Sequence, residues 1–264
     1  MSARVSPPAL AAVPDGLADQ VVIVTGGGRG LGRALAEGFT AAGAHVVITG
    51  RDAATLAETV AALTARGGSA LGVPADVARA ADVEALCATV RDAYGRIDVL
   101  VNNAGINPWY KPAQDTSLDE WQAVIDTNLT GVFLACREAG RVMLAQGAGA
   151  IVNVTSVAGR VALAKTTAYC AAKGGVELMT RQLALEWARK GVRVNAVAPG
   201  YFETDLTQGL RANAALAERV TGRTPMGRFG HPSELVGACL FLASPAASYI
   251  TGASLAVDGG WTAA

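Results

Sequence analysis

The chain has 264 residues, of which 51% are hydrophobic and 17% charged, and its 22 Lys and Arg residues balance 22 Asp and Glu residues. This length suits one α/β domain with a large apolar core, and a chain without net positive charge lacks the signature of proteins that bind nucleic acid or anionic membranes. Near-zero net charge with high apolar content favours self-association, so we expect a homo-oligomer.

The first segment, residues 1–18, is predicted to be a flexible arm. Pro7, Pro8 and Pro14 interrupt its apolar residues, which makes it a poor signal peptide or membrane span. No later apolar run approaches the ~18 residues that a bilayer requires without polar or glycine breaks. The 4 cysteines are widely spaced and form no C-x-x-C pair, which predicts reduced thiols and no metal site. We therefore expect a cytoplasmic protein.

From residue 19 onward, short runs rich in Val and Ile alternate with helical segments. The predicted strands are 21–26, 45–50, 70–77, 97–105, 150–156, 192–200 and 254–260. Helices are expected near 31–42, 53–65 and 80–93, within 118–145, near 167–189 and near 232–243. Uniformly apolar strands suit a parallel sheet that helices cover on both faces. The pattern predicts one α/β domain over 19–264 with a doubly wound sheet of seven parallel strands, and a lid at about 201–231.

The segment TGGGRGLG, residues 25–32, lies where the first predicted strand passes into the first predicted helix. Its glycines Gly26, Gly30 and Gly32 have the spacing G-x-x-x-G-x-G. Missing side chains let the backbone approach a pyrophosphate, and a helix N-terminus attracts an anion. Tight turns also use glycine for conformational reasons alone, but the position after the first strand favours a dinucleotide site.

The end of the second predicted strand bears on the choice of coenzyme. An acidic residue there typically binds the ribose of NAD, whereas an arginine accommodates the 2′-phosphate of NADP. In this chain Arg51 follows the strand, and Arg29 in the glycine turn supplies a second guanidinium on the same side. The sequence therefore favours NADP(H), with NAD(H) as the alternative because Asp52 follows directly.

The stretch YCAAK places Tyr169 and Lys173 four residues apart, on one face of a predicted helix. Alone this pattern is common and mostly structural, but Ser156 ends the fifth predicted strand and can face the same crevice. A tyrosine has a pKa of about 10, which a close ammonium and a positively charged nicotinamide are expected to lower by on the order of 1 to 3 units. Tyr169 is then a general acid or base, and Ser156 binds the substrate oxygen.

These motifs occur in order with NNAG (102–105), DTNLTG (126–131) and PGYFETD (199–205). Together they make the chain resemble the short-chain dehydrogenase/reductase family over nearly its whole length after residue 18. Within that family it is most similar to the branch of gluconate 5-dehydrogenase and 3-oxoacyl-acyl-carrier-protein reductase. The resemblance implies a Rossmann-type fold, a homotetramer, and interconversion of a secondary alcohol and a ketone by hydride transfer.

The resemblance also assigns functional positions. The implied catalytic residues are Asn128, Ser156, Tyr169 and Lys173, with Asn128 holding a water that links Lys173 to a proton relay; a buried structural role is the alternative for Asn128. With the two arginines, the expected cofactor-binding residues are Thr25, Gly26, Arg29, Gly30, Leu31, Gly32, Arg51, Asp76, Val77, Asn102, Ala104, Gly105, Tyr169, Lys173, Pro199, Gly200, Phe202 and Thr204.

The substrate pocket is expected between residues 106–112, the segment after Ser156, and the lid. Lys111 and Arg160 are candidates for binding a carboxylate, as an aldonate would require; an exposed loop packed against a neighbour is the alternative for 106–112. The predicted substrate residues are Trp109, Tyr110, Lys111, Ser156, Val157, Leu163 and Tyr201.

The substrate is expected to be a small molecule, with a keto-sugar acid such as 5-ketogluconate as the leading candidate. A 3-oxoacyl thioester reductase and a broad carbonyl reductase are alternatives within the same chemistry. An epimerase or lyase of the same fold could use the same tyrosine, whereas a nucleotide-binding regulator would not need all four catalytic residues.

Overall fold

The computed structural model describes residues 14–263. Its centre is a parallel sheet of 7 strands in the order β3-β2-β1-β4-β5-β6-β7, which confirms the predicted doubly wound architecture. The strands are β1 (Val21–Thr25), β2 (His45–Gly50), β3 (Ser69–Pro74), β4 (Val99–Asn102), β5 (Gly149–Val154), β6 (Val192–Pro199) and β7 (Ser254–Val257).

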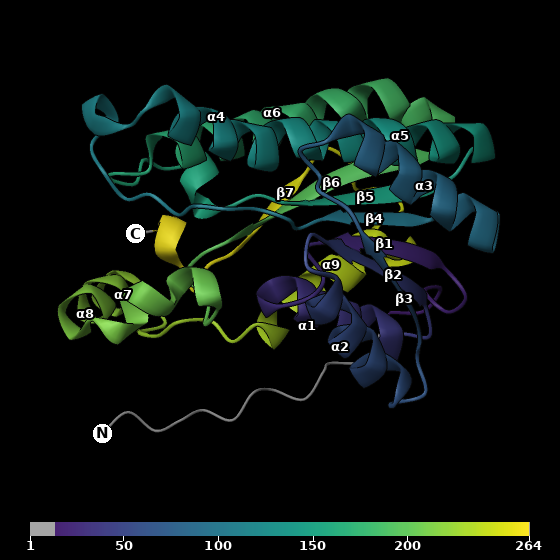
Figure 1. Cartoon of the computed structure of the whole chain (residues 1–264), viewed down its shortest axis with the longest axis horizontal. Helices are drawn as coiled ribbons and strands as arrows, with labels where there is room; N and C mark the ends of the chain where they lie inside the picture. Colours follow the sequence, from purple (N-terminus) through teal and green to yellow (C-terminus); the bar gives the residue numbers. More distant parts are fainter. Residues whose placement is uncertain (1–13, 264) are drawn as a thin grey trace.

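Helices cover both faces of the sheet (Figure 1). Helices α1, α2 and α9 lie on one face and α3, α4, α5 and α6 on the other, while α7 and α8 stand at one end of the molecule. The helices are α1 (Gly30–Ala41), α2 (Ala53–Thr64), α3 (Ala80–Tyr94), α4 (Leu118–Ile125), α5 (Gly131–Gln146), α6 (Thr167–Trp187), α7 (Gln208–Ala212), α8 (Ala214–Arg223) and α9 (Ser233–Ala243).

The uniform apolarity of the strands follows from this double cover. In β1, Val22 and Val24 pack into the core that includes residues of α1, α2 and α9, whereas Val21 and Ile23 pack into the core beneath α3, α5 and α6. Successive strand residues point to opposite faces. Both sets are therefore buried, and β1 shows no alternation of apolar and polar residues.

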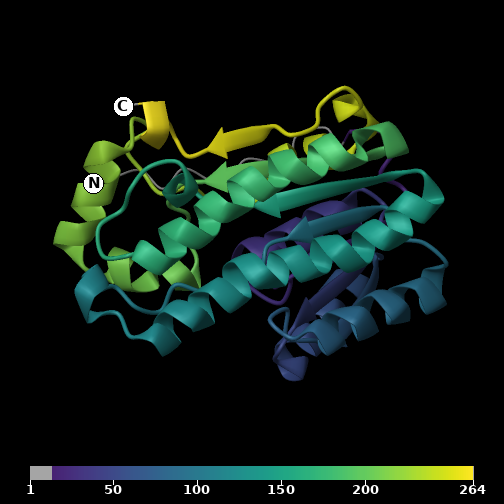
Figure 2. The same cartoon turned by 90° about the horizontal axis from the view of Figure 1, so that it is seen from above.

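The strand order reverses at β1, which pairs with β2 on one side and β4 on the other. In such sheets, ligands bind outside the carboxyl ends of the strands next to this reversal. Seen from above, α5 and α6 run side by side across the sheet toward the end that carries α7 and α8 (Figure 2). Most predicted site residues follow the carboxyl ends of β1 to β6, so the fold gathers them at one edge.

The predicted lid at about 201–231 is more regular than its sequence suggested, because it contains α7 and α8. Asn213 caps α8 by accepting a hydrogen bond from the Leu216 N–H at 3.2 Å. The two ends of the segment are held together by a β-bridge between Phe202 and Gly230. The segment is therefore a loop closed at its base, with two short helices beyond that closure.

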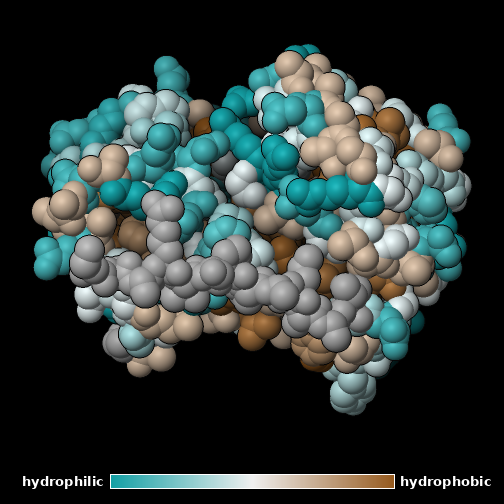
Figure 3. Space-filling model, turned by 90° about the horizontal axis from the view of Figure 1, so that it is seen from below, coloured by the Kyte–Doolittle hydropathy of each residue, from teal (hydrophilic) through white to brown (hydrophobic). Residues whose placement is uncertain are grey.

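The predicted arm, residues 1–18, falls largely on residues 1–13, which lie outside the described residues. Within the described part, Leu17 is only 1% exposed and belongs to the core that includes α1 and α9. The packed chain therefore begins before residue 19. Over residues 14–263, no helix combines the length and apolarity needed to span a bilayer, and the face seen from below intersperses hydrophilic and hydrophobic residues (Figure 3).

Candidate active site

The glycine turn joins β1 to α1 in a conformation that side chains would obstruct. Gly26 has φ +65° and Gly30 φ +54°, both in the left-handed region that favours glycine. A Cβ on Gly32 would overlap the carbonyl oxygen of Gly26, and one on Gly26 would lie 2.9 Å from the Ala104 Cα. The turn thus exposes backbone at the N-terminus of α1, and Leu31 packs against the core behind it.

The NNAG segment after β4 is tied to the glycine turn by an asparagine absent from the predicted site. Asn103 Nδ2 donates to the carbonyls of Thr25 at 2.9 Å and Gly26 at 3.2 Å. In return, the Thr25 hydroxyl accepts hydrogen bonds from the backbone N–H groups of Asn103 and Ala104, both at 3.0 Å. Asn103 therefore holds the glycine turn in place. In the sequence it can be recognised only as the second asparagine of NNAG.

The side chain of Asn102 is buried inside the fold, whereas a side chain that contacts a ligand is expected to face the site. It is 2% exposed, and its Nδ2 donates to Asn153 Oδ1 at 2.9 Å. Asn153 Nδ2 in turn donates to the Thr180 hydroxyl on α6 at 2.9 Å. The Asn102 amide is thus part of a buried network that connects β4, β5 and α6.

Asn128 and Lys173 meet at Gly105. Asn128 lies in a π-helical turn, Asp126–Thr130, between α4 and α5, and is fully buried. Its Oδ1 accepts from the Ile106 N–H at 2.8 Å and its Nδ2 donates to the Ile106 carbonyl at 2.7 Å. A Cβ on Gly105 would lie 2.9 Å from Asn128 Oδ1 and 3.7 Å from Lys173 Nζ.

Tyr169, Lys173 and Ser156 converge from α6 and the end of β5. Lys173 Nζ donates to the Val154 carbonyl at 2.8 Å and lies 5.7 Å from the centroid of the Tyr169 ring. Ser156 follows β5, and its hydroxyl accepts from the Ala158 N–H at 3.1 Å. The structure therefore gathers all four predicted catalytic residues between β4, β5 and α6.

Burial moves the pKa values of the two titratable residues in opposite directions. It raises the pKa of Tyr169 to about 12, although a hydrogen bond with Ser156 acts to lower it. It lowers the pKa of Lys173 from 10.5 to about 8. The expected lowering of the tyrosine pKa is thus not found in the chain itself, where burial of the phenol outweighs its neighbours. Tyr169 keeps its proton at neutral pH.

The two arginines expected at the coenzyme ribose are both exposed. Arg29 lies at the start of α1, and its Nη1 is 3.8 Å from Asp205 Oδ2. Arg51 follows β2 directly. The neighbouring Asp52 caps α2 by accepting hydrogen bonds from the N–H groups of Ala54 at 3.0 Å and Thr55 at 3.3 Å. This carboxylate is therefore occupied by the helix N-terminus.

The remaining positions that were expected to bind the cofactor lie on two segments. After β3, Asp76 accepts a hydrogen bond from the Ala78 N–H at 3.0 Å, and Val77 is buried against Gly131. After Pro199 ends β6, the Gly200 N–H donates to the Val257 carbonyl at 3.0 Å.

The chain then crosses above the glycine turn. Phe202 is 4% exposed, and a Cβ on Gly30 would lie 3.6 Å from the Thr204 side chain. The beginning of the lid segment therefore lies over the N-terminus of α1.

The two cations expected at the substrate are engaged by carboxylates of the chain. Lys111 Nζ is 2.6 Å from Glu120 Oε1. Arg160 Nε is 3.8 Å from the buried Glu177 carboxylate, and its guanidinium donates to the Ser254 carbonyl. Trp109 is half-buried and Tyr110 is 48% exposed. These pairs weaken the case for Lys111 and Arg160 as a carboxylate site.

The apolar side of the expected pocket is a small third core. This core contains three residues of the predicted pocket, Val157, Leu163 and Tyr201. It also contains five residues that were not predicted to lie there, which are Val161, Ala217, Val220, Phe229 and Trp261. The Tyr201 and Trp261 ring centroids are 4.8 Å apart. The C-terminal segment thus contributes an aromatic wall, and the only sequence signal for it was a lone tryptophan after β7.

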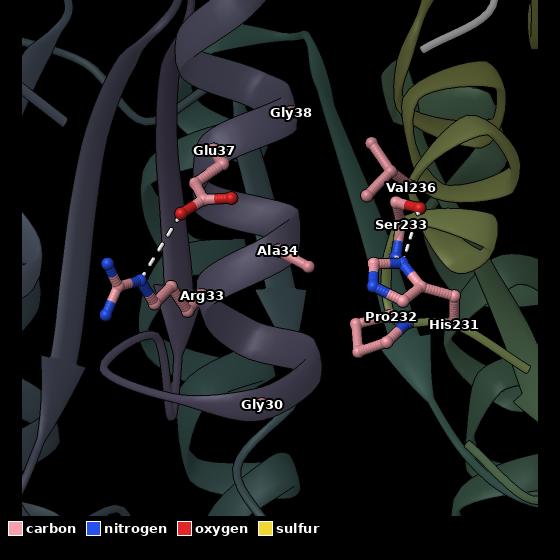
Figure 4. Close-up of a pocket in the computed structure, with 9 residues that line it drawn as sticks. All are labelled: Gly30, Arg33, Ala34, Glu37, Gly38, His231, Pro232, Ser233 and Val236. Atoms are coloured by element: carbon pink, nitrogen blue, oxygen red, sulfur yellow. Dashed lines mark hydrogen bonds and ion pairs between the residues drawn. The ribbon is translucent and has the colours of Figure 1, made fainter. Parts of the chain in front are cut away.

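A separate groove of about 220 Å³ lies between α1 and α9 (Figure 4). Arg33 pairs with Glu37 at 3.3 Å on one side, and His231 contacts the Ser233 hydroxyl at 2.8 Å on the other. The groove reaches Gly30 but includes none of the four predicted catalytic residues. It is therefore distinct from the site between β4, β5 and α6.

Comparison with known proteins identifies related proteins over nearly the whole chain. A family model described as enoyl-(acyl carrier protein) reductase matches residues 26–262. The 3-oxoacyl-[acyl-carrier-protein] reductase of Synechocystis sp. is 46% identical over 251 residues, which is 92% of this chain and 97% of that protein. The gluconate 5-dehydrogenase of Gluconobacter oxydans is 39% identical over 241 residues, 91% of this chain and 93% of that protein.

Among solved structures, a gluconate 5-dehydrogenase from Burkholderia cenocepacia in complex with NADP and tartrate superposes with a TM-score of 0.90 at 40% identity, covering 94% of this chain and 96% of that one. Both activities of the expected branch thus occur among the relatives. The site, the fold and these similarities together show that the chain belongs to the short-chain dehydrogenase/reductase family of oxidoreductases.

Proposed function

We propose that this protein is an NADP(H)-preferring oxidoreductase that interconverts a secondary alcohol and a ketone, with Tyr169 as the general acid and base. The observation that carries the proposal is the convergence of Asn128, Ser156, Tyr169 and Lys173 beside the glycine turn. A nucleotide-binding regulator would need the turn alone.

The residues present fit a dinucleotide. Gly26 and Gly32 are packed so closely that a Cβ would collide with backbone, which leaves peptide groups uncovered at the start of α1 for a pyrophosphate. Arg51 is exposed directly after β2, and the exposed Arg29 lies at the start of α1, where its Nη1 is 3.8 Å from Asp205 Oδ2. Both guanidinium groups suit a 2′-phosphate, because Asp52, the carboxylate that follows Arg51, already caps α2. NAD(H) is the weaker fit.

The bound coenzyme would supply a hydride to the ketone carbon, and the chain would manage the proton. Tyr169 holds its proton at neutral pH and would donate it to the carbonyl oxygen, while the Ser156 hydroxyl would donate a hydrogen bond to the same oxygen. Lys173, close to the phenol ring and in contact with the Val154 carbonyl, would stabilise the phenolate left behind. Asn128 would connect Lys173 to solvent through a water.

For the substrate, we propose a keto-sugar acid such as 5-ketogluconate. Gluconate 5-dehydrogenase among the relatives supports this choice, and 3-oxoacyl-[acyl-carrier-protein] reductase supports the alternative of a 3-oxoacyl thioester. A broad carbonyl reductase would share the same proton chemistry. An epimerase would recycle the coenzyme without net consumption.

The proposal includes a cytoplasmic homotetramer, each chain contributing one domain with a lid at about 201–231. Large apolar side chains on the outer surfaces of α5 and α6 support association: Phe133 is 45%, Leu178 66% and Leu185 78% exposed. Apolar residues this exposed are better accommodated at an interface between copies. The mass of the native assembly in solution tests this part.

The decisive experiment is NADPH consumption, alongside NADH, over a panel of keto-sugar acids, acetoacetyl thioesters, cyclic ketones and diketones. We expect net oxidation of NADPH with at least one ketone. A Tyr169→Phe variant should bind coenzyme normally and lose turnover. Near-full turnover in that variant would refute the assigned role, and interconversion of epimers without net coenzyme oxidation would favour the epimerase.

A further inference from the structure

Helix α8 carries two arginines, Arg219 and Arg223, that are four residues apart and so share one face. The Arg223 guanidinium carbon lies 4.5 Å from the centroid of the Trp261 ring. Trp261 is 4% exposed and packs against Tyr201. A cation stacked on an aromatic face loses much of its freedom, so Arg223 has a defined position although it is near the surface.

The side chains that hold Arg223 in place also pack near the predicted catalytic residues. Tyr201 and Trp261 belong to the same small core as Val157, which directly follows Ser156. Burial raises the pKa of Tyr201, and among the nearby groups Tyr110 also acts to raise it, whereas the charges of Arg223 and Arg219 act to lower it. Tyr201 and Tyr110 in turn act on the pKa of Tyr169. The arginines and the catalytic phenol therefore share one neighbourhood.

The two arginines have no acidic partner among residues 14–263, and Arg223 is stacked on the Trp261 ring instead. Within that part of the chain, neither guanidinium lies in an ion pair or a hydrogen bond, whereas Lys111, Arg160 and Arg228 each pair with a carboxylate. The buried Trp261 Nε1 beneath Arg223 also has no hydrogen-bond acceptor among the described residues. The two exposed guanidinium groups are thus the donors of this segment that an acidic ligand would satisfy, whereas the Trp261 Nε1 is buried.

We propose that Arg223, supported by Trp261 and assisted by Arg219, binds a carboxylate of the substrate, so that the enzyme selects ketones that carry an acid group. The inference rests on the proposed ketone reduction and assigns its specificity to α8 in place of Lys111 and Arg160. A guanidinium can bind a carboxylate through two parallel hydrogen bonds. The Trp261 contact pre-orders it for that purpose.

The test uses two ketones of matched shape, 4-oxocyclohexanecarboxylate and its carboxamide, which differ in charge. The ratio of kcat/KM for acid to amide is measured with NADPH in the full-length wild type and in single variants. We expect Arg223→Gln to lower kcat/KM for the acid about tenfold, as for loss of a hydrogen bond to a charged group, with less than about a twofold effect on the amide. Arg219→Gln should lower the ratio less.

Two further variants serve as controls. Arg189→Gln removes the same charge from an exposed position after α6 and should leave the ratio unchanged. Arg223→Lys keeps the charge but not the fork of donors, and should give an intermediate ratio; it also serves if the glutamine variant is poorly folded, which a thermal unfolding midpoint would reveal.

The outcomes separate this inference from the proposed function. A wild type that oxidises NADPH with neutral ketones but does not prefer the acid would overturn the carboxylate site alone. An equal loss for acid and amide in Arg223→Gln would show a packing role and would also overturn it. A wild type that reduces no ketone at all would overturn the proposed function itself.

Discussion

Replacing Lys173 by methionine should make the protein more stable at neutral pH while abolishing its activity. The lysine is 3% exposed, and burial lowers its pKa from 10.5 to about 8. At ~1.4 kcal/mol per pKa unit, holding this ammonium in the folded protein costs about 3 kcal/mol at pH 7. Lys173→Met also removes the hydrogen bond from Lys173 Nζ to the Val154 carbonyl, which reduces the gain in stability by about 1 kcal/mol. The expected net gain for Lys173→Met is about 2 kcal/mol.

The sign of the pH dependence follows from proton binding. Below pH 8 the lysine is protonated in both folded and unfolded chains, so the wild type bears the full cost. Between about pH 8 and 10.5 the unfolded chain binds the proton and the folded chain does not, so the free energy of unfolding of the wild type rises with pH. The advantage of Lys173→Met should therefore shrink across this interval.

Urea unfolding at pH 7 and pH 9.5, at one fixed protomer concentration, measures this difference. Lys190→Met is the matched control, because Lys190 is exposed and its loss should change stability by less than about 0.5 kcal/mol. A Lys173→Met variant that is no more stable than the wild type at pH 7, or whose advantage is the same at both pH values, would show that burial of the ammonium does not destabilise the fold.

Three further substitutions test separate parts of the site. Tyr169→Phe should lower kcat at least ~100-fold with unchanged coenzyme affinity by fluorescence titration; retained turnover contradicts the acid–base role. Arg51→Ala should weaken NADPH binding about tenfold with little effect on NADH, and equal losses contradict the 2′-phosphate assignment. Gly32→Ala should abolish coenzyme binding because its Cβ would overlap the Gly26 carbonyl. The control Gly237→Ala, in open space on α9, should leave coenzyme binding unchanged and should not lower the stability of the fold. Parallel calorimetric titrations with NADPH measure binding in both variants, and normal binding by Gly32→Ala contradicts the expected overlap.

The sequence predicted the sheet well because the order of strands and helices follows from local patterns. Most strands are rich in apolar residues, and the central strands are buried on both faces. The glycine turn was equally predictable from the sequence. The Gly26 carbonyl that excludes a side chain at Gly32 lies within seven residues of it in the chain. These features depend on contacts between residues that are close together in the sequence, and such local patterns can be read from the sequence alone.

What the sequence could not predict depends on contacts between distant segments. The Lys111–Glu120 ion pair and the Asp52 cap remove charges that looked available. Trp261 reaches Tyr201 across 60 residues of chain, and nothing in either local pattern indicates the other. The pKa of Tyr169 depends on how deeply the phenol is buried, which outweighed the charges that a motif-based argument could count.

The opposite pKa shifts of Tyr169 and Lys173 predict how reduction depends on pH. Proton donation leaves a phenolate, which the same burial that raises the pKa of Tyr169 to about 12 opposes. The ammonium of Lys173, 5.7 Å from the centroid of the Tyr169 ring, would offset this cost, and that charge is lost as pH rises through about 8. Reduction should therefore slow above pH 8 even though the tyrosine is still protonated.

The kcat for NADPH oxidation with a saturating ketone, measured from pH 6 to 10, tests this expectation. A fall centred near pH 8 is expected in the wild type. Lys173→Arg is the matched variant, because a guanidinium keeps its charge throughout this range, and whatever activity it retains should not fall at that point. A wild-type rate that stays level up to pH 10 would mean that the phenolate is stabilised by something other than the lysine charge, and that Lys173 matters for position instead.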